Sequence, residues 1–157
     1  MFFVLFGTIG SLRLAWIRAA ITSLAPIINC MPEEQPKPKI LLLEDEAMLA
    51  SMYKTKFERE GFEIVVAGDG EEGLEQAKAA SFDVVLIDII MPKLDGFAVL
   101  KQLRLLDAYK DVPILMLTNL GQEEDVEKGK ALGATDYLVK ANFTPSQVLE
   151  KIRAVSH

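Results

Sequence analysis

From residue 39 onward, short apolar runs alternate with longer segments whose apolar residues recur at helical spacing. Most of these runs are apolar throughout, rather than apolar at every second position, which is the pattern of strands buried on both faces. Such strands form parallel sheets that helices cover on both sides. The predicted strands are residues 39–43, 62–68, 82–87, 112–117 and 136–139.

The segments between these runs carry helix start and stop signals. The first helix is expected over residues 46–60, with Gly61 closing its end. A strand–helix unit repeated five times, with right-handed crossovers, leaves few topologies. The simplest is an α/β fold: a flavodoxin-like, doubly wound, five-stranded parallel sheet with strand order 2-1-3-4-5 and five helices. The expected caps and their first-turn partners are Asp69 with Glu72, Asp95, and Thr144 with Pro145 and Gln147.

Polar residues stand at the carboxyl ends of four predicted strands, where ligands bind in sheets of this kind. Each has an ordinary alternative: Asp45 could cap a helix, Thr118 could be a turn hydroxyl, and Lys140 could be a solvated lysine. Asp88 is the least ordinary, because two apolar residues follow it and the next cap candidate lies seven positions later. The residues at this edge are Glu44, Asp45, Asp88, Thr118 and Lys140.

Three of these residues are carboxylates, and they need a cation if they lie together. Two carboxylates about 5 Å apart repel by roughly 3 kcal/mol at an effective dielectric constant near 20. Because all the candidate ligand atoms are oxygens, the expected ion is Mg²⁺, with Mn²⁺ as the alternative. A metal, a carboxylate nucleophile, a hydroxyl and a lysine together form a phosphoryl-transfer site.

The rest of the composition excludes several other functions. The chain has one histidine, His157, and one cysteine, Cys30, so a histidine metal cluster, a Ser–His triad and an internal disulfide framework are not expected. A net charge of −6 gives no footprint for nucleic acid. No Gly-rich phosphate loop is present.

Residues 1–30 differ sharply from the remainder, because they contain no acidic residue and only two basic ones, Arg13 and Arg18. The two arginines break the stretch into runs too short for a regular spanning helix, and they follow the apolar residues instead of preceding them as in a secretory signal. We interpret residues 1–30 as a spurious upstream extension with Met31 as the true start, the alternatives being a membrane anchor and a cleaved signal. Residues 31–38 form a Pro-rich lead-in to a domain over residues 39–157.

Four segments resemble the receiver domain of bacterial response regulators, which act in two-component signalling. The resemblance covers residues 39–155, and its motifs stand in the family's order. It implies that Asp88 is the phosphoacceptor, with Asp45 as a direct metal ligand, Glu44 binding the metal through water, and the backbone carbonyl of Ile90 as a further ligand. The segments are "ILLLEDE" (40–46), "VVLIDIIMPKLDG" (84–96), "PILMLTN" (113–119) and "GATDYLVKA" (133–141).

The same resemblance implies a conformational switch. Lys140 is the paired lysine, Thr118 the hydroxyl that shifts toward the phosphoryl group, and Tyr137 the aromatic that rotates into the space left behind. The face formed by the fourth helix, the strand at 136–139 and the last helix would then change its contacts with partners.

The resemblance also implies the partners: a sensor histidine kinase or a phosphotransfer protein as donor, and a downstream protein as target. We expect a stand-alone, cytoplasmic signalling domain that binds no nucleic acid directly and contacts a membrane only if residues 1–30 are real. It would be no enzyme beyond self-phosphorylation and self-dephosphorylation. We expect self-dephosphorylation to be slow, because Ile90 and Leu120 are apolar where polar groups could orient the attacking water.

Two alternatives stay open from the sequence. One is a receiver-like interaction module that is never phosphorylated, which would not need all five edge residues. The other is an aspartate-nucleophile phosphatase, which would require a second acid two positions after the nucleophile, where Ile90 stands.

Overall fold

The computed structural model describes residues 36–156. The expectations for residues 1–30, and for residues 31–35 of the lead-in, therefore lie outside the described residues. The described part corresponds to one compact unit, Lys37–His157. Within it, no helix has the length and apolar character needed to cross a membrane.

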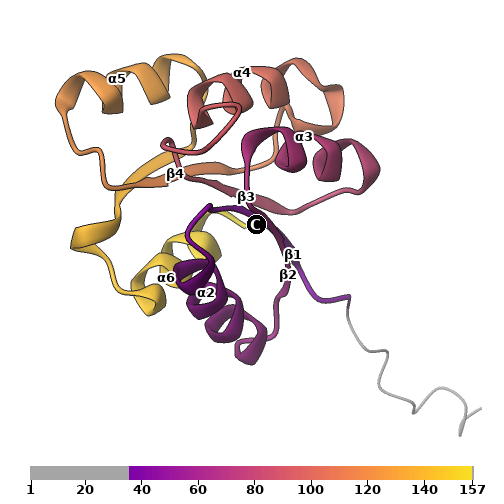
Figure 1. Cartoon of the computed structure of the whole chain (residues 1–157). Coiled ribbons are helices and arrows are strands. Elements are labelled where there is room, and N and C mark those ends of the chain that lie inside the picture. Colours follow the sequence, from indigo (N-terminus) through magenta and orange to yellow (C-terminus); the bar gives the residue numbers. More distant parts are fainter. Residues whose placement is uncertain (1–35, 157) are drawn as a thin grey trace, which may run out of the picture. The chain divides into compact units, whose positions relative to one another are not determined.

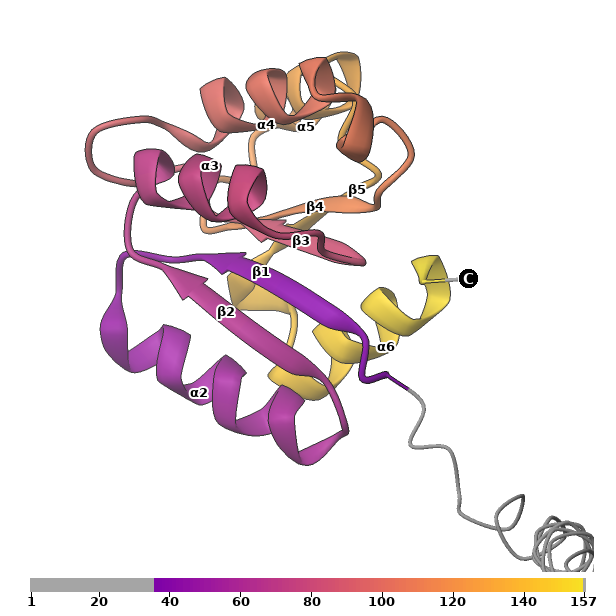
Figure 2. The ribbon, with the colours of Figure 1, turned by 90° about the vertical axis from the view of Figure 1, so that its right-hand side faces the viewer.

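Five parallel strands form one sheet in the order β2-β1-β3-β4-β5, which confirms the predicted topology. The first strand, β1, lies near the middle of the sheet, so the chain winds in one direction to β2 and in the other to β3, β4 and β5 (Figure 2). The strands are β1 Lys39–Leu43, β2 Glu63–Ala67, β3 Val84–Ile87, β4 Ile114–Thr118 and β5 Asp136–Val139.

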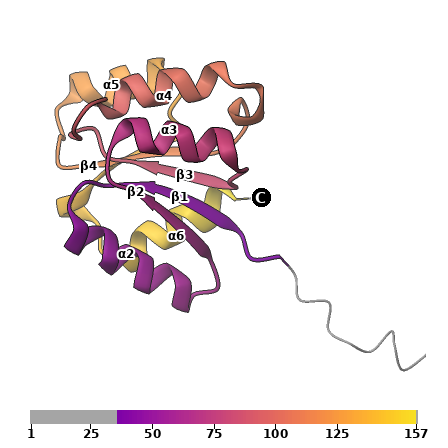
Figure 3. The same cartoon turned by 45° about the vertical axis from the view of Figure 1, so that its right-hand side comes forward.

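Helices cover both faces of this sheet (Figures 1 and 3). Two of them, α2 (Ala47–Arg59) and α6 (Pro145–Val155), lie on one face. The other face carries α3 (Gly70–Ala79), α4 (Gly96–Leu105) and α5 (Glu123–Ala131). Two short 3₁₀ helices, η1 Asp107–Tyr109 and η2 Lys140–Asn142, complete the described elements. The five predicted helices are therefore present, in three layers with the sheet between them.

The strands are apolar throughout because neighbouring residues pack into different cores. On β1, Leu41 and Leu43 belong to the cluster beneath α3 and α4, whereas Ile40 and Leu42 belong to the cluster beneath α2 and α6. All four side chains are at most 1% exposed. Burial on both faces, expected from the pattern of these runs, is confirmed.

The predicted helix caps are present. Asp69 accepts a hydrogen bond from the Glu72 amide, Asp95 accepts one from the Ala98 amide, and Thr144 forms a capping box with Gln147 after which Pro145 opens α6. One detail differs, because the Glu72 carboxylate accepts its backbone hydrogen bond from Gly68 instead of from Asp69.

Several predicted boundaries were wrong by one or two residues. The strand expected at 82–87 begins at Val84, because its pairing with β1 starts at the partners Ile40 and Val84. The strand expected at 112–117 runs from Ile114 to Thr118, so Thr118 ends the strand instead of following it. Apolar character extended the starts of these two predicted strands beyond the residues that are paired in the sheet.

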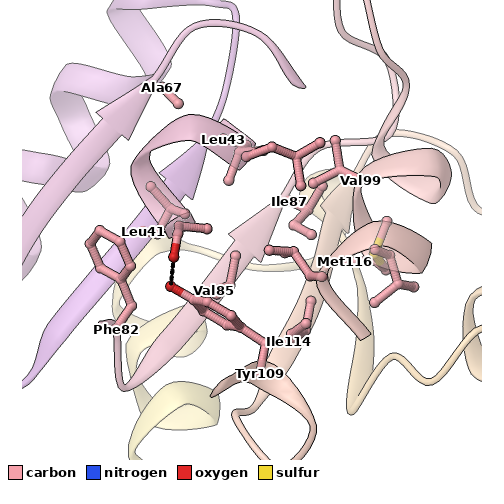
Figure 4. Packing of buried hydrophobic residues seen from close by; sticks show 14 of the residues in the cluster. Leu41, Leu43, Ala67, Phe82, Val85, Ile87, Val99, Tyr109, Ile114 and Met116 are labelled. Atoms are coloured by element: carbon pink, nitrogen blue, oxygen red, sulfur yellow. Dashed lines mark hydrogen bonds between the residues drawn. The ribbon is translucent and has the colours of Figure 1, made fainter. Parts of the chain in front are cut away.

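The core beneath α3 and α4 encloses Tyr109, whose side chain is 1% exposed (Figure 4). Its hydroxyl lies 2.9 Å from the carbonyl oxygen of Ala77 and 3.0 Å from that of Ala80, at the end of α3. These carbonyls have no partner further along the helix, so η1 supplies one across the core.

Candidate functional site

Residues that follow β1, β3 and β5 meet at one edge of the sheet and line a cavity of about 180 Å³. Glu44 follows β1, Asp88 follows β3 and Lys140 follows β5. Parallel strands deliver these three residues to the same edge because all of their carboxyl ends point in one direction. The full lining comprises Glu44, Asp45, Glu46, Asp88, Ile90, Asn119 and Lys140.

Lys140 lies between two buried carboxylates. Its Nζ atom is 2.5 Å from Asp88 Oδ2 and 2.6 Å from Glu44 Oε2. The side chains of Lys140, Glu44 and Asp88 are 7%, 1% and 9% exposed. The contact with Asp88 is a hydrogen bond, whereas Glu44 Oε2 lies close to the ammonium as an ion pair without the alignment of a hydrogen bond.

Carboxylate oxygens of Glu44, Asp45 and Asp88 all lie within 4.8 Å of one another. Lys140 balances one of these three negative charges. Burial raises the pKa of the Glu44 carboxyl, and the ion pair with Lys140 offsets that rise only in part. Burial lowers the pKa of Lys140, but the hydrogen bond to Asp88 and the negative charges of Asp88 and Glu44 outweigh this effect and raise the pKa, so the lysine is held protonated.

The donor set fits a hard divalent cation. Three carboxylates with one ammonium leave an excess of negative charge, because Glu44 and Asp88 share the ammonium of Lys140. Oxygen ligands are those that Mg²⁺ and Mn²⁺ prefer. Asp45 is the exposed member of this group, whereas Glu44 and Asp88 are buried.

The backbone after Asp88 folds back tightly on itself. The Ile90 amide lies 3.3 Å from Asp88 Oδ1, and the Gly96 amide donates to the Ile89 carbonyl at 3.0 Å. A Cβ atom at Gly96 would collide with the backbone carbonyl of Asp88. Asp95 therefore caps α4, and Gly96, which has no Cβ atom, allows the first residue of this helix to pack closely on the backbone of Asp88.

Thr118 lies deeper than the sequence suggested. Its side chain is fully buried, its hydroxyl oxygen lies 3.4 Å from the Leu120 amide, and it is not among the residues that line the cavity. The next residue, Asn119, is exposed and lines the cavity instead. Glu46 is a lining residue that sequence reasoning missed, although its place as the third acid of "EDE" was a usable signal.

Tyr137 connects β5 to the loop that follows β4. Its hydroxyl donates to the Leu120 carbonyl at 2.9 Å, and burial, followed by the charges of Asp125 and Asp88, raises the pKa of Tyr137 to about 12. Leu120 in turn lies next to Thr118 through its amide. A continuous path of contacts therefore runs from the end of β4 to the aromatic ring of Tyr137.

The two apolar residues expected to keep water from the site differ in position. The Ile90 side chain is 60% exposed and lines the cavity. Leu120 packs against the apolar cluster beneath α3 and α4 and is not a lining residue. Any exclusion of water from Asp88 by an apolar side chain therefore falls to Ile90.

Comparison with known proteins identifies the family. The sequence model of the family described as "Response regulator receiver domain" matches residues 40–153. The chain is 43% identical over 121 residues to a probable transcriptional regulator, ycf27, of Guillardia theta, covering 77% of this chain and 46% of that protein. It is 39% identical over 117 residues to the alkaline phosphatase synthesis transcriptional regulatory protein PhoP of Bacillus subtilis (strain 168), covering 74% and 48%.

Solved structures agree with this assignment. The chemotaxis protein CheY4 of Vibrio cholerae superposes with a TM-score of 0.72 at 38% identity, covering 76% of this chain and 98% of that one. The receiver domain of the Francisella response regulator 1452 gives a TM-score of 0.71 at 34% identity, covering 76% and 97%. The flavodoxin-like fold predicted from the sequence is therefore confirmed.

The chain spans about half the length of the curated relatives it matches. Those relatives carry names of transcriptional regulators, which is in tension with the expectation that this chain contacts no nucleic acid. The absence of direct nucleic-acid binding therefore stays a prediction, and it applies to the matched residues, 40–153. The family match covers most of the chain, and the curated relatives and the solved structures agree with it: the chain belongs to the response regulator receiver domain family.

Proposed function

We propose that this chain is the phosphoacceptor switch of a two-component or phosphorelay system, with Asp88 receiving the phosphoryl group. The observation that carries the proposal is the position of the Asp88 carboxylate, which is held by Lys140 at 2.5 Å and flanked by Glu44 and Asp45. The donor would be the phosphohistidine of a sensor histidine kinase or of a phosphotransfer protein.

In the proposed step, an Asp88 carboxylate oxygen attacks phosphorus while the bond between phosphorus and the donor's imidazole nitrogen breaks. The electron pair of that bond leaves with the imidazole, and an acyl phosphate forms on Asp88. Lys140, held protonated by its two carboxylate neighbours, would neutralise charge on the transferred oxygens.

Four groups would hold the cation: Asp45 directly, Glu44 through water, the Asp88 carboxylate, and the backbone carbonyl of Ile90. We expect magnesium, with manganese as the alternative, and the ion would supply charge neutralisation that Lys140 alone does not. The proposal is supported by the three carboxylate oxygens that lie within 4.8 Å of one another.

The phosphorylated form would change contacts with a protein partner through α5, β5 and α6. Thr118 and Tyr137 would carry the change, Thr118 by hydrogen bonding to the phosphoryl group and Tyr137 by moving with the β4–α5 loop. The bond between the Tyr137 hydroxyl and the Leu120 carbonyl supports this path, because it ties the aromatic ring to the residue whose amide meets Thr118. We place this signalling in the cytoplasm.

Intact-mass analysis after treatment with a small phosphoryl donor and Mg²⁺ tests this proposal. We expect wild-type protein to gain one phosphoryl group, and we expect the gain to vanish in Asp88→Ala or after chelation of the metal. Asp107→Ala is a matched control, because Asp107 is a highly exposed aspartate that forms an ion pair with Lys110. A wild type that gains nothing would favour the interaction module that is never phosphorylated.

A further inference from the structure

The loop of residues 88–95 carries both Asp88 and Ile90, and it contains a strained residue. Lys93 has a φ of 64°, and among residues 36–156 it is the only non-glycine residue with a positive φ. A side chain with a Cβ atom is disfavoured in this region, so the surrounding structure must hold it there. Residues held in this way concentrate at functional sites.

An ion pair holds Lys93 in place. Its Nζ atom lies 2.6 Å from Asp69 Oδ2 and 3.9 Å from Glu71 Oε2. Asp69 is 15% exposed, and its other oxygen caps α3 by accepting from the Glu72 amide at 2.9 Å. The cap and Lys93 together lower the pKa of Asp69, so this carboxylate is charged at neutral pH and available to the lysine.

The same two segments also meet through their backbones. Gly70, the first residue of α3, faces Leu94, and a Cβ atom there would collide with the Leu94 carbonyl oxygen and with the Val99 side chain. The loop after Asp88 therefore lies directly on the start of α3, with no side chain between them. Two neighbouring loop residues, Lys93 and Leu94, thus contact two neighbouring residues of α3's amino-terminal end, Asp69 and Gly70.

We infer that Lys93 is a positioning residue: through its ion pair with Asp69 it holds the loop of residues 88–95 against α3. It thereby fixes the position of Ile90, whose amide lies near Asp88 and whose carbonyl is a proposed metal ligand. The inference rests on the proposed function, because it concerns the affinity of the site for its cation. Lys93 touches neither the cation nor Asp88. It acts by limiting the positions that the loop can occupy before the ion binds, and such preorganisation raises affinity.

Magnesium titration of the full chain, followed by amide shifts in NMR spectra, tests the inference. Loss of a partly exposed ion pair should weaken Mg²⁺ binding about threefold. We expect this loss in Lys93→Ala and equally in Asp69→Asn, in which asparagine still caps α3. The double variant should be no weaker than either single variant, because both remove one interaction. Lys93→Arg, which keeps the charge, should bind like wild type.

Two further variants separate positioning from a general effect on folding. Lys93→Gly removes the ion pair and also relieves the strain of the positive φ at position 93. It should therefore bind Mg²⁺ as weakly as Lys93→Ala does, while being more stable to urea than Lys93→Ala. Lys110→Ala removes a comparable ion pair, with Asp107 at 2.6 Å, and should leave Mg²⁺ affinity unchanged.

If the Lys93→Ala and Asp69→Asn variants bind Mg²⁺ with wild-type affinity, the positioning role is overturned and the proposed function still stands. The same follows if the fold-loss of Mg²⁺ affinity in the double variant equals the product of the two single losses. A wild-type protein that binds no Mg²⁺ at all would overturn the proposed metal site and this inference with it.

Discussion

Glu44, Asp88 and Lys140 form a buried charged group whose burial costs desolvation free energy that an apolar core would not incur. Such a group is weak support for stability, and removal of one partner leaves the others uncompensated. Its place at the sheet edge, beside the exposed Asp45, fits a group retained for its chemistry. At this scale the site should be more stable with fewer negative charges or with a cation present.

We predict that Asp45→Asn raises the free energy of unfolding by about 1 kcal/mol in metal-free buffer, because it removes one of three mutually repelling carboxylates. Added Mg²⁺ should stabilise the folded wild type, because a ligand stabilises the state that binds it. It should stabilise this variant much less, because the variant lacks the carboxylate proposed to bind the ion directly. Urea unfolding with and without Mg²⁺ measures both effects. A variant less stable than the wild type without metal would contradict the account of charge repulsion.

Ile90 is the side chain that could keep water from a phosphorylated Asp88. We predict that Ile90→Asn shortens the lifetime of the acyl phosphate on the order of tenfold, because an amide can orient the attacking water where the exposed isoleucine cannot. Ile90→Val should decay like wild type. Leu120→Glu should have the smaller effect, since Leu120 packs away from the cavity. Equal lifetimes in Ile90→Asn and wild type would remove Ile90 from the explanation.

At the scale of elements, η1 stabilises the end of α3 through one hydroxyl. We predict that Tyr109→Phe lowers the free energy of unfolding by about 1 kcal/mol, because the carbonyls of Ala77 and Ala80 lose their hydroxyl donor and the contact with Ala77 is buried. Urea unfolding with an unchanged m-value measures this loss. Stability equal to wild type would mean that these carbonyls find another partner.

α5 approaches the sheet through a glycine. Gly129 is its one buried residue, and a Cβ atom there would lie 3.2 Å from Tyr137 Cδ2. Glycine inside a helix costs about 0.5–1 kcal/mol relative to alanine, so Gly129→Ala should gain stability unless the ring opposes it. The hydrogen bond from the Tyr137 hydroxyl to the Leu120 carbonyl opposes a shift of the ring away from Gly129.

We therefore predict that Gly129→Ala gains about 0.5–1 kcal/mol in a Tyr137→Ala background and clearly less in the wild-type background. The four free energies of unfolding form a double-mutant cycle that measures the crowding directly. An equal gain in both backgrounds would show that Gly129 does not limit the position of Tyr137.

The elements themselves were readily predicted, because their signals are local. Caps such as Asp69, Asp95 and Thr144 bond to amides within three residues, so sequence spacing suffices to find them. The ends of the strands were less accurate, since pairing with a neighbouring strand decides them. Phe82 looked like part of a strand because it is apolar, but it lies before the first paired residue, Val84.

At the scale of the whole molecule, the sheet edge could be predicted because parallel topology alone brings Glu44, Asp88 and Lys140 together. How deeply each side chain at this edge is buried could not be predicted in the same way. Thr118 and Asn119 are neighbours in sequence, and only the packing of β4 decides that Thr118 is buried and Asn119 lines the cavity.

Contacts between loops were beyond the sequence as well. The ion pair of Lys93 with Asp69 joins residues that are far apart in the chain and depends on an unusual φ angle. Nothing in the sequence indicates that this lysine and this aspartate form a pair.

The most direct test of the central claim is to locate the phosphoryl group. Borohydride reduces an acyl phosphate to an alcohol, so a phosphorylated aspartate becomes homoserine, which peptide mass spectrometry can place in the sequence. After treatment with a phosphoryl donor and Mg²⁺, the account predicts homoserine at position 88, with Asp45 and Asp95 unchanged. Homoserine at another position, or at none in a folded protein that binds Mg²⁺, would contradict it.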